Sequence, residues 1–137
     1  MGEVVLKAVC LDTDILIDHL RGDREATRRI EELEGTGNIL STTAINAFEL
    51  YCGAKKTLKR RENTEAVRRL LDRLLVFSFD ERAAENAGEL AAKLEADGAS
   101  IGLRDVLIGA TVIVNDGELM TRNIKHFEKI DDIELIR

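Results

Sequence analysis

Three acidic residues lie in separate segments of the sequence, beside or among apolar residues, where burial of a charge is unfavourable. Asp12 follows a short apolar run, Glu49 lies among apolar residues, and Asp105 begins an almost wholly apolar segment. Carboxylates that gather at one place repel one another unless cations lie between them. Such oxygen ligands suit Mg²⁺ or Mn²⁺, which activate water and stabilise charge in phosphoryl displacement. The three acids are therefore compatible with a metal-dependent phosphoesterase.

Asp12 and Asp105 also have structural interpretations. Asp12 and Asp14 fit turn and capping chemistry before a helix that begins at Ile15, and this explains Asp14 better than Asp12. An acid in the first turn of a helix, such as Asp105, is favoured by the helix dipole. The residues one turn further on, Ile108 and Gly109, offer Asp105 no charge partner, which leaves its charge at the edge of the core.

Glu49 conflicts with the pattern of its own helix. Ile45, Phe48 and Cys52 mark the apolar face of this helix by their spacing. Glu49 follows Ile45 by one helical turn, so it is expected inside that stripe and buried. A buried carboxylate needs a partner. Either a metal ion or an arginine would provide one.

The elements that must position these acids alternate between strands and helices. Strands are predicted at about 9–11, 38–41, 76–79, 118–121 and 133–136, and helices at about 15–20, 25–33, 43–53, 60–75, 81–96 and 106–114. Asp80 is expected to cap the fifth helix, and Thr42 or Thr43 the third. This alternation predicts a single α/β domain with a mainly parallel central sheet and helices on both faces. The ligand site of such a sheet lies at the carboxyl ends of its strands.

Composition narrows the class of protein. The 137 residues are 45% hydrophobic and 34% charged, and no apolar run approaches the length that spans a membrane. The first residues do not resemble a signal peptide, so a cytoplasmic protein is expected. Cys10 and Cys52 lie in apolar surroundings without metal-ligand spacing, which predicts buried free thiols and argues against zinc.

Charge is unevenly distributed along the chain. A net charge of −6 argues against nucleic-acid binding through bulk charge. The segment 55–61 (KKTLKRR) is nevertheless strongly basic, and Arg68, Arg69 and Arg73 follow it at helical spacing. This basic segment is either a contact for an RNA backbone or a solvated helix face.

Four segments resemble, in order, the motifs of PIN domains. Residues 11–17 (LDTDILI) resemble the opening strand–loop–helix motif, and residues 48–54 (FELYCGA) the second motif, with Glu49 as its acid. Residues 104–110 (RDVLIGA) resemble the third motif, with Asp105 as its acid. Residues 120–127 (MTRNIKHF) resemble the closing element of VapC-type toxins. The resemblance extends over essentially the whole chain, so residues 1–137 are expected to form one PIN-like nuclease domain.

The resemblance implies a ribonuclease that cuts single-stranded or loop RNA, and the toxin of a type II toxin–antitoxin pair. It implies that Asp12, Glu49 and Asp105 hold one or two divalent ions, Mg²⁺ or Mn²⁺, and through them the attacking water. Asn123 would be a further catalytic residue, as a neutral ligand or by orienting bound water, and Thr121 would help to shape the pocket.

The sequence departs from the motifs at Asn123 and His126, where many relatives carry acids. The number of metal ions, one or two, is therefore left open. Related toxins are commonly dimers that an antitoxin neutralises by laying a short segment over the active-site groove. The resemblance thus implies a homodimer with an antitoxin protein as partner and RNA as substrate, and no membrane association.

Two other functions compete with this interpretation. Asp12-Thr13-Asp14 superficially resembles the nucleophile motif of haloacid-dehalogenase-type phosphatases, in which Asp12 would be phosphorylated. That interpretation leaves the position of Glu49 unexplained. The other alternative is a PIN-like binding module without catalysis, which the neutral Asn123 favours and the three acids oppose.

Overall fold

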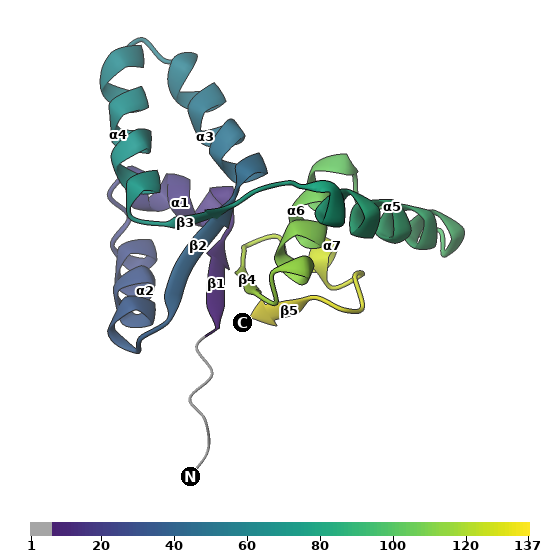
Figure 1. Ribbon diagram of the computed structural model, residues 1–137. Coiled ribbons are helices and arrows are strands. Elements are labelled where there is room, and N and C mark those ends of the chain that lie inside the picture. The colour runs from purple at the N-terminus through teal and green to yellow at the C-terminus, as the bar shows by residue number, and fades with distance from the viewer. Residues whose placement is uncertain (1–6) are drawn as a thin grey trace.

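A five-stranded parallel sheet forms the centre of the protein in a computed structural model that describes residues 7–137 (Figure 1). All neighbouring strands pair in parallel, which confirms the predicted fold class. The prediction that the first residues are no signal peptide concerns residues outside the described range. The sheet order is β3-β2-β1-β4-β5, with strands β1 (Ala8–Leu11), β2 (Ile39–Thr43), β3 (Leu75–Phe77), β4 (Glu118–Met120) and β5 (Glu134–Ile136).

Helices cover both faces of the sheet, as predicted. Because side chains alternate along a strand, Val9 and Leu11 of β1 enter one hydrophobic core and Cys10 enters the other. The first core receives side chains from the first four helices, and the second core from the last three and from Ile45 of the third. These helices are α1 (Thr13–Leu20), α2 (Arg24–Gly35), α3 (Ala44–Lys55), α4 (Arg60–Asp72), α5 (Glu81–Ala96), α6 (Leu103–Val114) and α7 (Ile124–Phe127).

Helix boundaries follow the capping residues. Thr43 and Asp80 cap α3 and α5 as predicted, by accepting hydrogen bonds from backbone amides of the first turns. The prediction that α1 begins at Ile15 is wrong. Its N-cap is Asp12, whose side chain accepts a hydrogen bond from the Thr13 amide, so the helix begins directly after β1. The short helix α7 was not predicted.

The apolar face predicted for α3 is also wrong. Phe48 is 67% exposed, and the buried residues of this helix are Asn46, Leu50 and Ala54. Glu49 is consequently a neighbour of the buried stripe, with a side chain that is 26% exposed. Apolar residues lie on several sides of α3, so their spacing did not identify the face that packs against the sheet.

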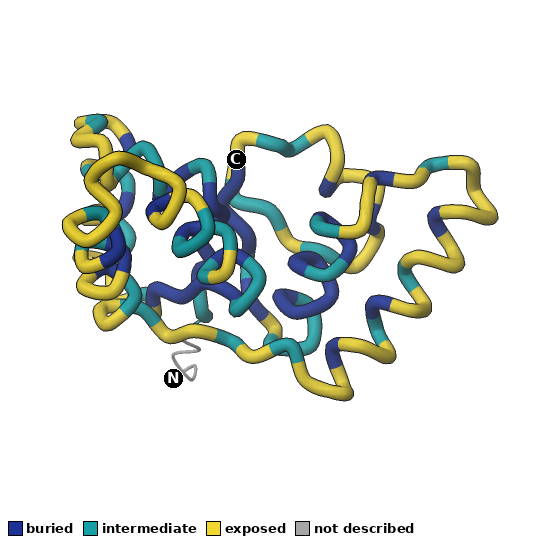
Figure 2. The backbone as a smooth tube through the Cα atoms, turned by 90° about the horizontal axis from the view of Figure 1, so that it is seen from above, coloured by how far each residue is buried: buried dark blue, intermediate teal, exposed yellow. Residues whose placement is uncertain are grey.

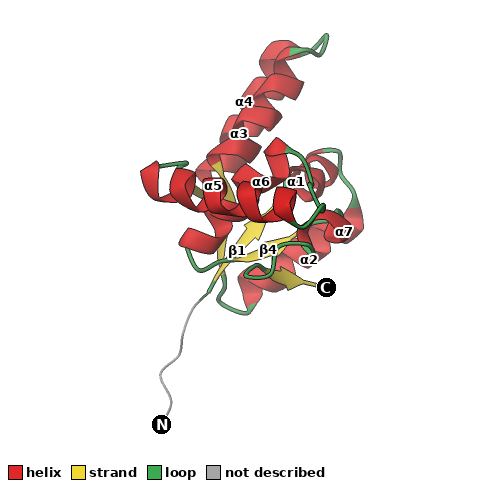
Figure 3. Cartoon of the chain, turned by 90° about the vertical axis from the view of Figure 1, so that its right-hand side faces the viewer, coloured by secondary structure: helices red, strands yellow, loops and turns green. Residues whose placement is uncertain are grey.

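Helices α3 and α4 form a hairpin that stands out from the rest of the molecule (Figures 1 and 3). The turn between them, residues 56–59, is fully solvent-exposed at Leu58. In Figure 2 the buried residues concentrate in the middle of the molecule, whereas α5 is largely exposed. The fold thus has a buried centre and an exposed helical projection on one side.

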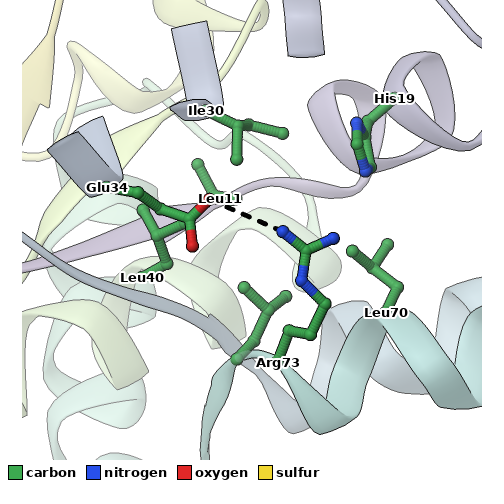
Figure 4. Close-up of a pocket in the computed structure, with 8 residues that line it drawn as sticks. Leu11, His19, Ile30, Glu34, Leu40, Leu70 and Arg73 are labelled. Atoms are coloured by element: carbon green, nitrogen blue, oxygen red, sulfur yellow. Dashed lines mark hydrogen bonds and ion pairs between the residues drawn. The ribbon is translucent and has the colours of Figure 1, made fainter. Parts of the chain in front are cut away.

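A small cavity of about 10 Å³ lies among α1, α2 and α4, beside the end of β1 (Figure 4). Leu11, Leu40 and Leu70 line it, and Arg73 pairs with Glu34 at its side with an N–O distance of 3.5 Å. A space of this size admits at most one water molecule. It therefore belongs to the packing of the core.

Both cysteines are free thiols, as predicted. Cys10 is fully buried, and this burial, with the nearby charge of Asp12, raises the pKa of its thiol to about 12. Cys52 is only half-buried, because α3 turns a different face to the core. In residues 7–137 no helix has the length and apolar character needed to cross a membrane.

Candidate active site

The candidate site lies where the chain leaves the central strand. β1 is flanked by β2 on one side and β4 on the other, so the connections on its two sides diverge at their carboxyl ends. Ligand sites of open parallel sheets form at such switch points. Asp12 directly follows β1 and Thr121 directly follows β4. The middle of α3 supplies Glu49 and the first turn of α6 supplies Asp105, so the structure brings the three acids to one region.

Asp12 is buried and its carboxylate is fully engaged. Its Oδ1 accepts hydrogen bonds from the Thr13 amide at 2.8 Å, Asn46 Nδ2 at 2.9 Å and Arg104 Nη2 at 2.8 Å. Its Oδ2 accepts from Thr121 Oγ1 at 2.7 Å. Charge-assisted hydrogen bonds of this kind offset the cost of burying an ionised group. The side chain of Asp12 is therefore fixed in one orientation.

Glu49 belongs to the same hydrogen-bond network as Asp12. Its Oε1 accepts a hydrogen bond from Thr13 Oγ1 at 2.6 Å, and its Oε2 accepts from Arg104 Nε at 2.6 Å. The amide of Asn46 donates to Thr13 Oγ1 at 2.9 Å. Asn46 also closes a capping box with Thr43 at the start of α3. Asn46, in the first turn of α3, thus links Asp12 to Glu49 through Thr13.

Asp105 lies in the first turn of α6 and is also buried. Its Oδ1 accepts a hydrogen bond from Arg104 Nη1 at 2.5 Å. Its Oδ2 lies 2.7 Å from His126 Nδ1 and 3.2 Å from Asn123 Nδ2. The partners of Asp105 do not lie one turn further along its helix: Arg104, directly before it, supplies a positive charge, and Asn123 and His126 after β4 supply polar contacts.

Arg104 contacts all three acids at once. Its guanidinium nitrogens lie 2.8 Å from Asp12, 2.6 Å from Glu49 and 2.5 Å from Asp105. Partial burial disfavours the charge of Arg104, but hydrogen bonds and the negative charges of these acids raise its pKa above the ordinary value. The arginine partner considered for Glu49 is thereby confirmed. The acids converge on a guanidinium, which offsets the repulsion expected among them.

The donor set fits a divalent cation, although within residues 7–137 no three His, Cys, Asp or Glu side chains are close enough to hold one as they stand. Three carboxylates with one guanidinium leave a formal charge of −2 at the site. Oxygen ligands of this charge suit a hard divalent ion. The three carboxylates already converge on one common cation, the guanidinium of Arg104.

Asp14 lies beside the site and not in it. Its carboxylate accepts hydrogen bonds from the amide of Ile15 at 2.7 Å and from that of Arg122 at 3.0 Å. Burial, with the charge of Asp12 as the next contribution, raises the pKa of Asp14. Asp14 thus fastens the loop that carries Thr121 and Asn123 to the start of α1.

Sequence reasoning missed part of this network. Asn46 was not singled out, although a polar residue three positions after a capping threonine, with Leu50 and Ala54 following at helical spacing, is the available signal. The third motif includes Arg104, but its resemblance to PIN domains assigns this residue no role. Its position directly before Asp105, at the start of an apolar helix, was the indication that it could reach the acids.

Comparison with known proteins gives one matching family model, "PIN domain", over residues 9–133. Among characterised proteins, the chain is 30% identical to ribonuclease VapC2 of Rickettsia felis, over 91% of this chain and 93% of the relative. It is 31% identical to ribonuclease VapC19 of Mycobacterium tuberculosis, over 90% of this chain and 95% of the relative. The similarity therefore covers nearly the full length of both proteins.

Solved structures agree with the sequence comparison. The chain resembles one in VapBC2 from Rickettsia felis bound to a DNA fragment from their promoter, with a TM-score of 0.87, 28% identity, and coverage of 94% of this chain and 97% of that one. It also resembles one in a toxin–antitoxin complex from Klebsiella pneumoniae, with a TM-score of 0.74, 28% identity, and coverage of 96% and 97%.

Proposed function

The chain belongs to the PIN-domain family, and we propose that it is the toxin ribonuclease of a toxin–antitoxin pair, which cleaves single-stranded RNA with Mg²⁺ or Mn²⁺. The observation that carries this proposal is the meeting of Asp12, Glu49 and Asp105 on one cationic group at the switch point of the sheet. Relatives named as ribonucleases share the domain over nearly its whole length, which supports the same chemistry here.

The three carboxylates are proposed to hold the divalent cation. When bound, this ion supplies the Lewis acidity that activates water and stabilises charge on the phosphodiester. The chain fixes the carboxylates beforehand: Asn46 and Thr121 orient Asp12, and Thr13 orients Glu49. Such support keeps ligands in place and tunes their affinity.

Asn123 and His126 are proposed to act on the outer side of Asp105. Both contact its Oδ2, and His126 is exposed to solvent. This arrangement supports the predicted role of Asn123 as a group that orients a ligand or bound water. Asn123 and His126, neither of which is an acid, occupy positions at which many relatives carry one. This supports a site for one cation.

RNA is proposed to bind along the hairpin of α3 and α4. Glu49 lies on α3, and five exposed cations follow it at the end of α3, in the turn and at the start of α4. Within residues 7–137, only Arg61 among these has a carboxylate within salt-bridge distance, Glu65 at 3.6 Å. The others are free to contact phosphates. We call these five cations the basic tip: Lys55, Lys56, Lys59, Arg60 and Arg61.

The partner is proposed to be an antitoxin that covers the site. A groove of about 260 Å³ lies between α1 and the hairpin, directly beside Glu49. Ile17, Leu20, Leu50 and Val67 give it an apolar lining. An apolar groove at the edge of a charged site suits a short amphipathic segment. The predicted homodimer stays a prediction.

A cleavage assay tests the function. Labelled single-stranded RNA and a matched duplex are incubated with the protein in Mn²⁺, Mg²⁺ or EDTA. The proposal expects cleavage of the single strand with either ion and none in EDTA. Cleavage that persists in EDTA would contradict the metal-dependent mechanism. A folded protein that binds RNA without cutting it under any of these conditions would favour the binding module.

The toxin role needs a separate test in cells. Induced expression of the chain should arrest growth, and expression of the Asp105→Asn variant should not. Co-expression of a small DNA-binding protein encoded directly upstream should restore growth and co-purify with the chain. Growth unaffected by the active enzyme would contradict the toxin assignment while leaving the ribonuclease assignment intact.

A further inference from the structure

We infer that Arg104 is a positioning residue of the metal centre, which holds Asp12, Glu49 and Asp105 together in the metal-free protein and must leave them when a divalent cation binds. This inference rests on the proposed function, because it concerns the same site. It assigns Arg104 a role in setting the affinity for metal, in addition to any role in folding.

The fork of the guanidinium matches the three acids one by one. Nε pairs with Glu49, Nη2 with Asp12 and Nη1 with Asp105, so each nitrogen serves a different carboxylate. A divalent ion bound to the same oxygens would lie within a few ångströms of a unit positive charge. The two cations therefore compete for one position.

Each carboxylate keeps another partner when Arg104 leaves. Asp12 retains its hydrogen bonds from Thr121 and Asn46, and Glu49 retains the one from Thr13. Asp105 retains His126 and Asn123, as contacts of its other oxygen. The site is therefore built to survive the loss of the guanidinium, which distinguishes Arg104 from the residues that hold the acids permanently.

The surroundings of Arg104 favour its departure. Its side chain is 36% exposed, whereas those of Asp12 and Asp105 are 2% and 6% exposed. It lies in the first turn of α6, where the helix dipole disfavours a positive charge, and the N-cap Gly102 offers no side chain to hold it. Within residues 7–137 the guanidinium bonds no acceptor other than these acids, so neutralising them with metal releases it to solvent.

Calorimetric titration of Mn²⁺ tests the competition. The proteins are the wild type, Arg104→Met, Arg104→Lys and the control Arg28→Met, which removes an equal charge and two carboxylate partners on the exposed face of α2. Arg104→Met is expected to bind Mn²⁺ about tenfold or more tightly, because no charge remains to be displaced. Arg104→Lys should lie between it and the wild type, since one ammonium cannot serve three carboxylates. Arg28→Met should bind as the wild type does.

Thermal melts test the same competition through the stability of the protein with and without metal. In EDTA, Arg104→Met should melt below the wild type because the three acids repel one another, and saturating Mn²⁺ should reverse this order. If Arg104 serves only the stability of the fold, Arg104→Met will bind Mn²⁺ as the wild type does or more weakly. This result would overturn the inference. Absence of Mn²⁺ binding by every variant and by the wild type would instead contradict the proposed function.

The wild type alone provides a test that does not depend on a variant folding. The ¹⁵Nε–H resonance of Arg104, assigned by its loss in Arg104→Lys or by through-bond experiments, should shift on addition of Mg²⁺ and gain rapid exchange with water. The resonance of Arg28 should do neither. An Arg104 resonance unchanged at saturating Mg²⁺ would show that the guanidinium stays on the acids, contrary to the inference.

Discussion

The acid cluster (Asp12, Glu49 and Asp105) and the basic tip differ in how they are held. Asp12 is bonded to side chains 34, 92 and 109 residues away, from Asn46, Arg104 and Thr121. At the tip, the contacts are local: Arg61 pairs with Glu65 one helical turn away, and Asn63 bonds Thr57. One region exists only in the complete fold, whereas the other is a property of a single hairpin.

This difference suits the acid cluster to catalysis and the basic tip to RNA binding. Placing ligands for catalysis requires fixed geometry, which the interlocked hydrogen bonds around Asp12 provide. Binding a flexible RNA strand requires positive charge near phosphates but little geometric precision. Changes in the acid cluster should therefore abolish the chemical step and spare RNA binding. Changes in the basic tip should weaken RNA binding and spare the chemical step.

The largest effect is expected from Asp12→Asn or Asp105→Asn. Each removes a ligand charge and about 4 kcal/mol of transition-state stabilisation, which corresponds to a rate about 10³-fold lower. The measurement is single-turnover cleavage at saturating RNA and Mn²⁺, with circular dichroism to verify the fold. Undiminished cleavage by Asp12→Asn would place the metal elsewhere. The affinity for RNA in EDTA should stay within about twofold of the wild type, because neither residue belongs to the basic tip.

A smaller effect on the acid cluster is expected from Asn46→Ala. Its amide donates to both Asp12 and Thr13, so its loss should lower Mn²⁺ affinity by about 10–100-fold. The free energy of unfolding should fall by about 1–3 kcal/mol, because buried partners lose their hydrogen bonds. Asn63→Ala on the hairpin, which also removes an amide-to-threonine hydrogen bond, is the control. Equal Mn²⁺ affinity in both variants would show that the support of Asp12 is unimportant.

Neutralising the basic tip should act on binding alone. If all five cations contact phosphates, the slope of log affinity against log salt should fall by about 3.5 for single-stranded RNA, and the affinity itself by about tenfold or more. The cleavage rate at saturating RNA should not change. A variant with five other exposed cations replaced keeps the same net charge as the test variant: Arg24, Arg28, Lys93, Lys129 and Arg137. If both variants show the same slope, the tip is a solvated helix face.

The smallest effect is expected from an exposed ion pair outside both regions. Lys93 of α5 lies 2.5 Å from Asp131, and this partner lowers the pKa of Asp131. A lowered carboxylate pKa stabilises the fold above the unfolded pKa, and this contribution is lost as the pH falls through the folded value. Asp131→Asn should therefore reduce the melting temperature slightly at pH 7 and not at all in acid. A difference that persists unchanged in acid, or that Asp132→Asn reproduces, would rule out the ion pair as its cause.

Much of the architecture could be predicted because it depends on local patterns. Alternating apolar runs located the strands and most helices, and Thr43 and Asp80 identified helix starts by capping chemistry. The motifs also selected Asp12, Glu49 and Asp105, which the fold brings to one region. The rest depends on contacts between distant segments. The exposure of Phe48 follows from how α3 packs, and the three contacts of Arg104 require β1, α3 and α6 to be in place.

The acid cluster is proposed to bind a divalent cation. Crystals grown with Mn²⁺, with data collected on both sides of the manganese absorption edge, test it most directly. We expect an anomalous peak within about 2.3 Å of one carboxylate oxygen each of Asp12, Glu49 and Asp105. That peak should disappear in crystals of Asp105→Asn. A manganese peak held by other residues, or no peak in the wild type at a concentration that supports cleavage, would contradict the claim.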